Sequence, residues 1–274
     1  MKKRITTITL LVLSLFTTLY SQEIPIENLE TQLSDNTQQY SKSILVNEIK
    51  DIDVEHIALT SKNPILDYNK DGYKTIYLFV KGNGSVIVQD SIYDIVPETI
   101  FLPNIKDITI KTAEKDTLHY VKITSKLTAQ DLLDLKEFPA ESTQNVYYAK
   151  FTDCVPYTEP IKSPNTVSRT ILPNKIIPRI AMGTVQTKGP DEVGAHKHPM
   201  LEQLFLGLSE NNCVVFADDA KVNFPQHSML HIPLGSSHSV TVDKDEVLYY
   251  VWMDFFLDKK GEEWLKTHNV SDDN

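Results

Sequence analysis

The strongest constraint on the fold of this chain is an internal repeat. The stretch that begins at Pro103 aligns without a gap with the stretch that begins at Pro233, 130 positions later, and the match continues for 34 residues. Identical pairs mark the register: Leu118, Tyr120, Val121, Leu127, Leu135 and Lys136 match Leu248, Tyr250, Val251, Leu257, Leu265 and Lys266. Similarity at a fixed spacing indicates that one structural unit occurs twice. We therefore predict two copies of one small fold, of which only one needs to keep a chemistry.

Both copies are rich in short runs of Val, Ile, Tyr and Thr. Turn signals such as Asn69–Gly72 and Gly82–Gly84 separate these runs in the first copy, and Leu204–Gly207 in the second copy resembles Leu78–Gly82. Short strands at regular spacing are typical of β-sandwiches and β-barrels. The predicted fold class is all-β, with two jelly-roll-like barrels in tandem and short helices at the barrel ends.

The two copies flank a proline-rich segment. We predict that residues 23–150 form the first barrel with an N-terminal arm, and that residues 179–268 form the second. The segment between them, residues 151–178, contains Pro156, Pro160, Pro164, Pro173 and Pro178. Proline removes a backbone donor, so this segment is neither a helix nor a central strand. We predict a linker, or an arm draped across a neighbouring domain.

The N-terminal residues have the pattern of a protein-targeting signal. Lys2, Lys3 and Arg4 precede an apolar run, Ile5–Tyr20, and a small polar break follows. This pattern is typical of a cleaved secretory signal, and the run is shorter than the roughly 20 apolar residues that span a bilayer. We predict that residues 1–22 are a signal peptide, that the protein is periplasmic or secreted, and that it has no membrane contact after cleavage.

Charge and cysteine content narrow the functional classes. The formal charge is −10, and loss of three basic residues with the signal would make it −10 − 3 = −13. Such a chain does not bind nucleic acid through a basic surface. Export permits a disulfide between Cys154 and Cys213, although Cys213 lies in a valine-rich run where a buried free thiol is the alternative. The sequence leaves this choice open.

Metal-ligating residue types gather in the second copy. His196 and His198 are two residues apart and would share one face of a strand, and Glu202 returns to that face four residues later. His238 follows a tight turn that begins at Pro233. Three imidazoles and one carboxylate suit a divalent transition metal such as manganese, iron, nickel or zinc. His231 is interpreted as a structural histidine.

The spacing HxHx3E followed by PxGxxH resembles the paired motifs of the cupin superfamily. The resemblance implies two cupin barrels, with His196, His198, Glu202 and His238 as the metal ligands of the second. The positions that match these ligands in the first copy are Lys70, Gly72, Ile76 and Ile108. These side chains do not form a metal site, so the resemblance implies a degenerate N-terminal cupin and a metal-binding C-terminal cupin.

A narrower resemblance involves the last predicted strand. Small cupins of the KdgF type, which convert 4,5-unsaturated uronates to linear ketouronates, carry Asp, Phe and Arg at spacing 0, +2 and +6. Asp254 and Phe256 match the first two, and Lys260 stands in place of the arginine. The family also uses a glutamine where we assign Glu202, and Gln203 is the next residue.

These patterns favour an exported, metal-dependent enzyme that acts on a small anionic carbohydrate, such as a uronic-acid sugar or oligosaccharide. The reaction would be a lyase, dehydratase or ring-opening isomerase step in which Asp254 moves a proton. Phe256 would pack against the sugar ring, and Lys260 and Arg179 would attract the carboxylate of the sugar. A cupin dioxygenase and a non-catalytic sugar- or metal-binding module are the alternatives. A homodimer is a further expectation.

Overall fold

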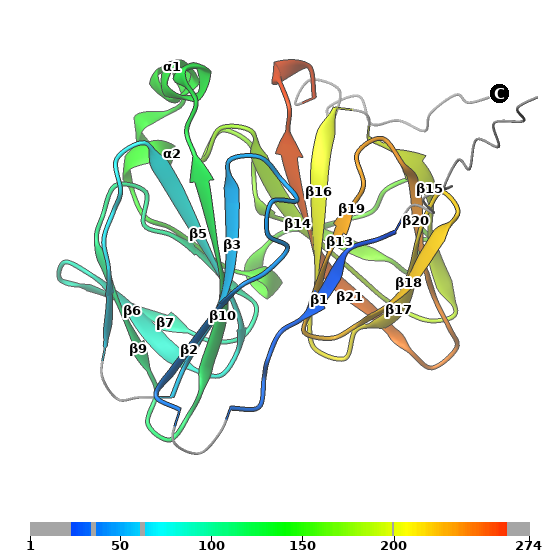
Figure 1. Ribbon diagram of the computed structural model, residues 1–274, viewed down its shortest axis with the longest axis horizontal. Coiled ribbons are helices and arrows are strands. Elements are labelled where there is room, and N and C mark those ends of the chain that lie inside the picture. The colour runs from blue at the N-terminus through cyan, green and yellow to red at the C-terminus, as the bar shows by residue number, and fades with distance from the viewer. Residues whose placement is uncertain (1–22, 34–36, 61–63, 199, 262–274) are drawn as a thin grey trace, which may run out of the picture.

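The computed structural model describes residues 23–33, 37–60, 64–198 and 200–261, which form two β-barrels side by side (Figure 1). The predicted signal peptide lies outside the described residues, as do Leu265 and Lys266, the last two residues of the second copy that match the first. Strands dominate and helices are few and short, so the predicted all-β class is confirmed. No helix in the described ranges is long and apolar enough to cross a membrane.

Each barrel consists of a large and a small antiparallel sheet. The first barrel has a six-stranded sheet in the order β11, β8, β5, β10, β3, β2 and a four-stranded sheet in the order β4, β9, β6, β7. Its strands are β2 (Gln39–Ser43), β3 (Ile52–Leu59), β4 (Ile65–Asp67), β5 (Tyr73–Lys81), β6 (Gly84–Val88), β7 (Ser91–Ile95), β8 (Thr99–Leu102), β9 (Ile108–Thr112), β10 (Leu118–Lys126) and β11 (Tyr147–Lys150).

The second barrel repeats this topology. Its large sheet has the order β1, β19, β16, β21, β14, β13, β12, and its small sheet has the order β15, β20, β17, β18. Its strands are β1 (Ile26–Asn28), β12 (Pro156–Tyr157), β13 (Val167–Leu172), β14 (Ile180–Lys188), β15 (Asp191–Lys197), β16 (Leu201–Gly207), β17 (Asn212–Ala217), β18 (Ala220–Pro225), β19 (Ser228–Ile232), β20 (Ser237–Val242) and β21 (Val247–Phe256).

Strand register refines the repeat. Ile123 on β10 pairs with Ile76, and the repeat-related Met253 on β21 pairs with Leu204, so Ile76 and Leu204 are equivalent. The sequence alignment had matched Leu204 with Leu78, two positions away. A shift of two residues keeps the same face of a strand, so the apolar pattern is equally good in both alignments. Only the cross-strand partner distinguishes them.

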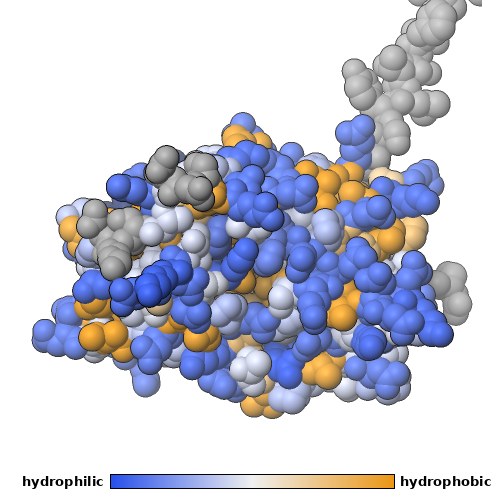
Figure 2. Space-filling view, turned by 90° about the horizontal axis from the view of Figure 1, so that it is seen from below, coloured by the Kyte–Doolittle hydropathy of each residue, from blue (hydrophilic) through white to orange (hydrophobic). Residues whose placement is uncertain are grey.

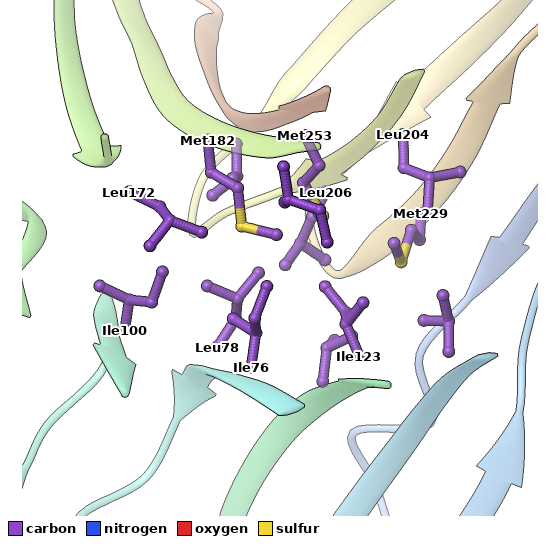
Figure 3. Close-up of a cluster of buried hydrophobic side chains, with 14 of the residues drawn as sticks. Ile76, Leu78, Ile100, Ile123, Leu172, Met182, Leu204, Leu206, Met229 and Met253 are labelled. Carbon is purple, nitrogen blue, oxygen red and sulfur yellow. The ribbon is translucent and has the colours of Figure 1, made fainter. Parts of the chain in front are cut away.

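The largest hydrophobic core lies between the barrels. The two large sheets face each other, and Figure 3 shows side chains of the first barrel, such as Ile76, opposite side chains of the second, such as Leu204. Each barrel also has its own interior core, which contains Tyr77 in the first and Phe205 in the second. Successive residues therefore face the interior and the interface in turn, as strand geometry requires.

Two arms connect the barrels. β1 precedes the first barrel in sequence but pairs with β19 at the edge of the large sheet of the second barrel. The corresponding edge position of the first barrel is occupied by β11, which pairs with β8. The N-terminal arm that we assigned to residues 23–150 thus adds a strand to the second barrel. The prediction that the proline-rich stretch contains no central strand is wrong: β13 lies between Pro164 and Pro173, is free of proline, and pairs with β14 on one side and β12 on the other. The proline-bearing β12 lies at the sheet edge.

Short helices lie at one end of the first barrel (Figure 1). They are α1 (Ala129–Glu137) and α2 (Ala140–Gln144). The 3-10 turn η1 (Phe151–Asp153) lies apart from them, and its Phe151 is buried in the core between the barrels. Thr128 begins α1 with a capping box, in which its hydroxyl accepts from the Asp131 amide and the Asp131 carboxylate accepts from the Thr128 amide. On the face seen in Figure 2, hydrophobic residues occur in small separate groups among polar ones.

The two cysteines do not form a disulfide. Cys154 is partly buried, and Cys213 is a buried free thiol near Asn211 on the β17 side of the second barrel. Of the two alternatives that the sequence left open, the buried free thiol at Cys213 is therefore confirmed.

Candidate metal centre and its pocket

Three histidines converge in the interior of the second barrel. His196 is on β15 and pairs directly with His238 on β20, while His198 follows β15 by one residue. One ring nitrogen from each lies within 4.8 Å of the others. The ring centroids are 4.3 Å apart for His196 and His238, and 4.7 Å apart for His196 and His198. The three imidazoles that the spacing predicted as ligands therefore form one cluster.

Local backbone features orient these rings. A bulge interrupts the β15–β20 register between Val193 and His196, which re-aims the strand at the histidines. The His196 Nδ1 atom lies 2.8 Å from the carbonyl oxygen of Gly194 and donates to it. A carbonyl only accepts, so the proton is on Nδ1, and Nε2 is the nitrogen with which His196 could bind a metal. His238 follows a turn in which the Ser236 amide donates to Pro233 at 3.1 Å.

Glu202 does not join this cluster. It lies on the face of β16 toward the first barrel, and its Oε2 is 3.0 Å from His231 Nε2. His231 Nδ1 is 2.8 Å from a carboxylate oxygen of Glu48, a residue of the first barrel. The assignment of Glu202 as a ligand is therefore corrected, because its position in the strand register turns it away from the histidines. His231 has the structural role that we expected.

Of the two neighbours Glu202 and Gln203, it is Gln203 that lines the cavity of the histidine cluster. It is directly opposite Asp254 in the β16–β21 pairing, faces the barrel interior, and lines the same cavity as the three histidines. Its Nε2 donates to Asp254 Oδ1 at 2.8 Å. Its Oε1 is buried and accepts no hydrogen bond from the described residues. Three imidazoles and a buried amide oxygen fit a divalent transition metal.

Asp254 is buried beside this cluster. Burial raises the pKa of its carboxyl group to about 7, the hydrogen bond from Gln203 opposes this shift, and the carboxylate of Glu159 adds to it. A carboxyl group with a pKa near neutrality can both donate and accept a proton at physiological pH. Asp254 is therefore suited to the proton transfer that the sequence predicted for it.

The cluster lies in a cavity of about 450 Å³. This is within the range of roughly 300–1,000 Å³ that is typical of small-molecule sites. Its apolar walls include Phe205, Tyr250 and Trp252. A Cβ atom on Gly183 would lie 2.3 Å from the Trp252 ring, so a glycine there lets the indole lie across β14. The cavity is thus large enough for one sugar unit and offers aromatic faces to it.

The other predicted site residues lie elsewhere. Arg179 forms a two-bond ion pair with Asp131, at 2.8 and 2.9 Å, in a separate groove between α1 and the segment after β21. Lys260 lines that groove and not the cavity. Phe256 is on the same face of β21 as Asp254 but packs in a buried cluster with Leu201. Arg179 comes just before β14 and Lys260 just after β21, so the strand ends place both beyond the barrel interior.

Sequence reasoning missed one wall of the cavity. Tyr157, Glu159, Lys162 and Thr170 line it, and all four come from the segment predicted as a linker. The β-type run Val167–Leu172 was the available signal that this segment belongs to a sheet. The prolines around it obscured that signal.

The described residues of the first barrel contain no equivalent cluster. Asp67 pairs with Ile108 as His196 pairs with His238, and Thr75 pairs with Thr124 as Gln203 pairs with Asp254. Lys70, Gly72 and Ile76 are therefore not the equivalents of His196, His198 and Glu202 that the sequence repeat predicted. The predicted equivalence of Ile108 and His238 agrees with the strand register. Within the described ranges, the three histidines of the second barrel are the one group with metal-ligand geometry.

Comparison with known proteins shows the fold. No protein-family model matches the chain, and no curated protein matches it in sequence. A mutant of oxalate decarboxylase from Bacillus subtilis superposes with a TM-score of 0.61 at 12% identity, and the match covers 90% of this chain and 84% of that one. The chain has a cupin fold. A cupin 2 conserved barrel domain protein from Leptotrichia buccalis gives a TM-score of 0.57 at 15% identity, covering 82% and 92%.

A third solved cupin neighbour is protein Ylba from E. coli, with a TM-score of 0.65 at 8% identity and coverage of 86% and 92%. These matches extend over both barrels of this chain. At such identities they establish the architecture, and the activity has to be argued from the site itself.

Proposed function

We propose that this protein is an exported, metal-dependent cupin enzyme that acts on an acidic sugar of the unsaturated uronate class. The observation that supports the proposal most is the placement of Gln203. It lines the same cavity as His196, His198 and His238, so it could supply the glutamine of a three-histidine, one-glutamine set like that of KdgF-type cupins, and its partner Asp254 is the residue that matches their aspartate in sequence.

The side chains of the cavity have distinct roles in this proposal. His196, His198, His238 and Gln203 would hold the ion. A divalent metal in this position supplies Lewis-acid polarisation of a substrate oxygen. Asp254 moves a proton on the bound sugar, since its pKa of about 7 suits both directions of transfer. Trp252 and Phe205 provide walls for the sugar ring and exclude water.

The chemistry needs no further reactant. Conversion of a 4,5-unsaturated uronate to its linear keto form relocates protons and opens the ring, so no oxidant, reductant or second substrate is consumed. The corrected positions of Arg179 and Lys260 remove them from this mechanism, because both line another groove. Export through the predicted signal peptide would place the enzyme in the periplasm or outside the cell, where polysaccharide fragments occur.

The test is turnover of unsaturated uronides by the metal-loaded protein, followed as loss of their ultraviolet absorbance. Asp254→Asn should lower the rate by about 10²- to 10⁴-fold, the usual contribution of a general acid or base. Asp219→Asn, the same change at an exposed position, should leave the rate unchanged. Equal rates for Asp254→Asn and the wild type would exclude the assigned role.

Two results would favour the alternatives. Sugar binding without turnover by the metal-loaded protein would identify a binding module. Oxygen consumption with an aromatic or diketone substrate would identify a dioxygenase, since the same ligand types also suit iron.

A further inference from the structure

The proline-rich segment from Tyr157 to Lys162 is attached directly to the histidine-bearing strand. The Gly194 amide donates to the carbonyl of Ile161 at 2.9 Å, and Lys162 forms an isolated bridge with Val193. Gly194 in turn accepts from His196. One short peptide stretch thus supports both the segment and a ligand, which places the side chains of the segment at a defined position in the cavity.

Lys162 is the unusual residue of this segment. Its side chain is only 6% exposed, although it lines the cavity. Its Nζ donates to Ser168 Oγ at 3.0 Å and forms an ion pair with the carboxylate of Glu159. Burial lowers the pKa of the ammonium group, and the neighbouring carboxyl groups of Glu159 and Asp254 oppose this.

A buried lysine is costly to the fold. Removing an ammonium group from water sacrifices much of its hydration free energy, and a surface pair gives a similar link between segments without that cost. Among the described residues that line the cavity, Lys162 is the one with a side chain that carries a full positive charge. Its partner Glu159 is more exposed, at 26%, so the pair can open on the Glu159 side without leaving a deeply buried carboxylate.

On the basis of the proposed function, we infer that Lys162 binds the carboxylate group of the acidic sugar, and that Glu159 occupies the lysine until the sugar arrives. The substrate carboxylate replaces or shares the bond that Glu159 makes. A neutral sugar of the same shape would leave Lys162 paired with Glu159 and would gain nothing from it. Lys162 therefore determines the preference for acidic sugars, a role that we had expected for Lys260 and Arg179.

Binding of a ligand that does not react tests this inference separately from turnover. Calorimetry would compare D-glucuronate with its methyl ester, which has the same ring without the charge. We expect the wild-type, metal-loaded protein to prefer the acid by about tenfold or more, the effect of one charge-assisted hydrogen bond. Lys162→Met should abolish this preference, and Lys162→Arg should retain much of it because the charge remains.

Two further variants control for folding and for net charge. Lys188→Met makes the same charge change at an exposed position outside the cavity and should bind like the wild type. Glu159→Gln should bind glucuronate more tightly, because it removes the competing carboxylate. Since misfolding would weaken binding, a gain of affinity in this variant reports on the site itself. Metal content should equal that of the wild type in all variants.

The inference is overturned if the wild type binds glucuronate and its ester equally, or if Lys162→Met keeps the preference. Failure of the proposed function would appear differently. In that case unsaturated uronides would not be turned over, whereas the discrimination between glucuronate and its ester would still depend on Lys162.

Discussion

Glu202 and Gln203 are neighbours in the chain but lie on opposite faces of β16. Gln203 faces Asp254 in the barrel interior, and Glu202 faces His231 between the barrels. Alternation along a strand produces this separation, and a shift of one residue in register would exchange the two. One step along the backbone thus separates a candidate metal ligand from a residue that ties the barrels together through His231 and Glu48.

Substitution of each residue should therefore affect a different property. Gln203→Ala should weaken metal binding by about tenfold or more, because it removes an oxygen donor and releases its partner Asp254. Glu202→Ala should leave metal affinity unchanged. It should lower the free energy of unfolding by about 1–3 kcal/mol, because a buried imidazole loses a partner.

Competition with a chelator of known affinity measures the first effect, and urea unfolding of the metal-free protein measures the second. If Glu202→Ala releases the metal while Gln203→Ala retains it, the assignment of Gln203 is wrong.

At the scale of strands, β3 and β10 carry an unusual pair. His56 and His119 are both 1% exposed, their facing nitrogens are 3.4 Å apart, and their rings are stacked. Burial lowers the pKa of each to about 4, from an ordinary value of 6.5, and no carboxylate bonds to either among the described residues. The other charged or titratable groups that act on the pair are His227, Lys42, Lys81 and Asp116.

This pair should make stability depend on pH. Between pH 6.5 and about 4 the unfolded chain binds protons that the folded chain does not, so the free energy of unfolding falls as the pH is lowered through this window. Its contribution is fully present above pH 6.5. Urea unfolding at pH 7, 6 and 5 measures the slope.

Replacement of both histidines by phenylalanine keeps aromatic packing between the strands and removes the titration. The double variant should show a smaller decrease in stability over this pH range. An unchanged slope would mean that other groups account for the pH dependence.

At the scale of the whole molecule, the two barrels share their largest core. The apolar faces of the two large sheets are buried against each other, and β1 and the segment that contains β12 and β13 add chain from outside the second barrel to its sheet. The first barrel therefore covers an apolar sheet that the barrel with the histidine cluster would otherwise expose to water. We expect the barrels to unfold together.

Leu78→Ala tests this coupling from the first barrel, which does not contain the histidine cluster. Leu78 is fully buried in the shared core, and its truncation should cost about 2–5 kcal/mol of stability. Far-ultraviolet circular dichroism and tryptophan fluorescence should report one coincident urea transition, shifted to lower denaturant concentration. Leu66→Ala, the same change at a residue that is 60% exposed, should have little effect. Two separate transitions would show that the barrels are independent.

The sequence by itself determined the all-β class and the occurrence of one structural unit twice. It also identified the three histidines that form the cluster. These features depend on local patterns: alternation along strands, a fixed repeat spacing, and metal-ligating residue types in order. The sequence also contained Gln203 beside Glu202, but strand period alone could not choose between neighbours whose register is set by their partner strand.

Only the tertiary structure decided the remaining features. In the structure Gln203 faces the barrel interior, and Arg179 and Lys260 line another groove. Lys162 lines the cavity, although it belongs to the segment predicted as a linker. These outcomes depend on cross-strand pairing between residues far apart in the chain. Such pairing is set by the packing of whole sheets, and no local pattern records it.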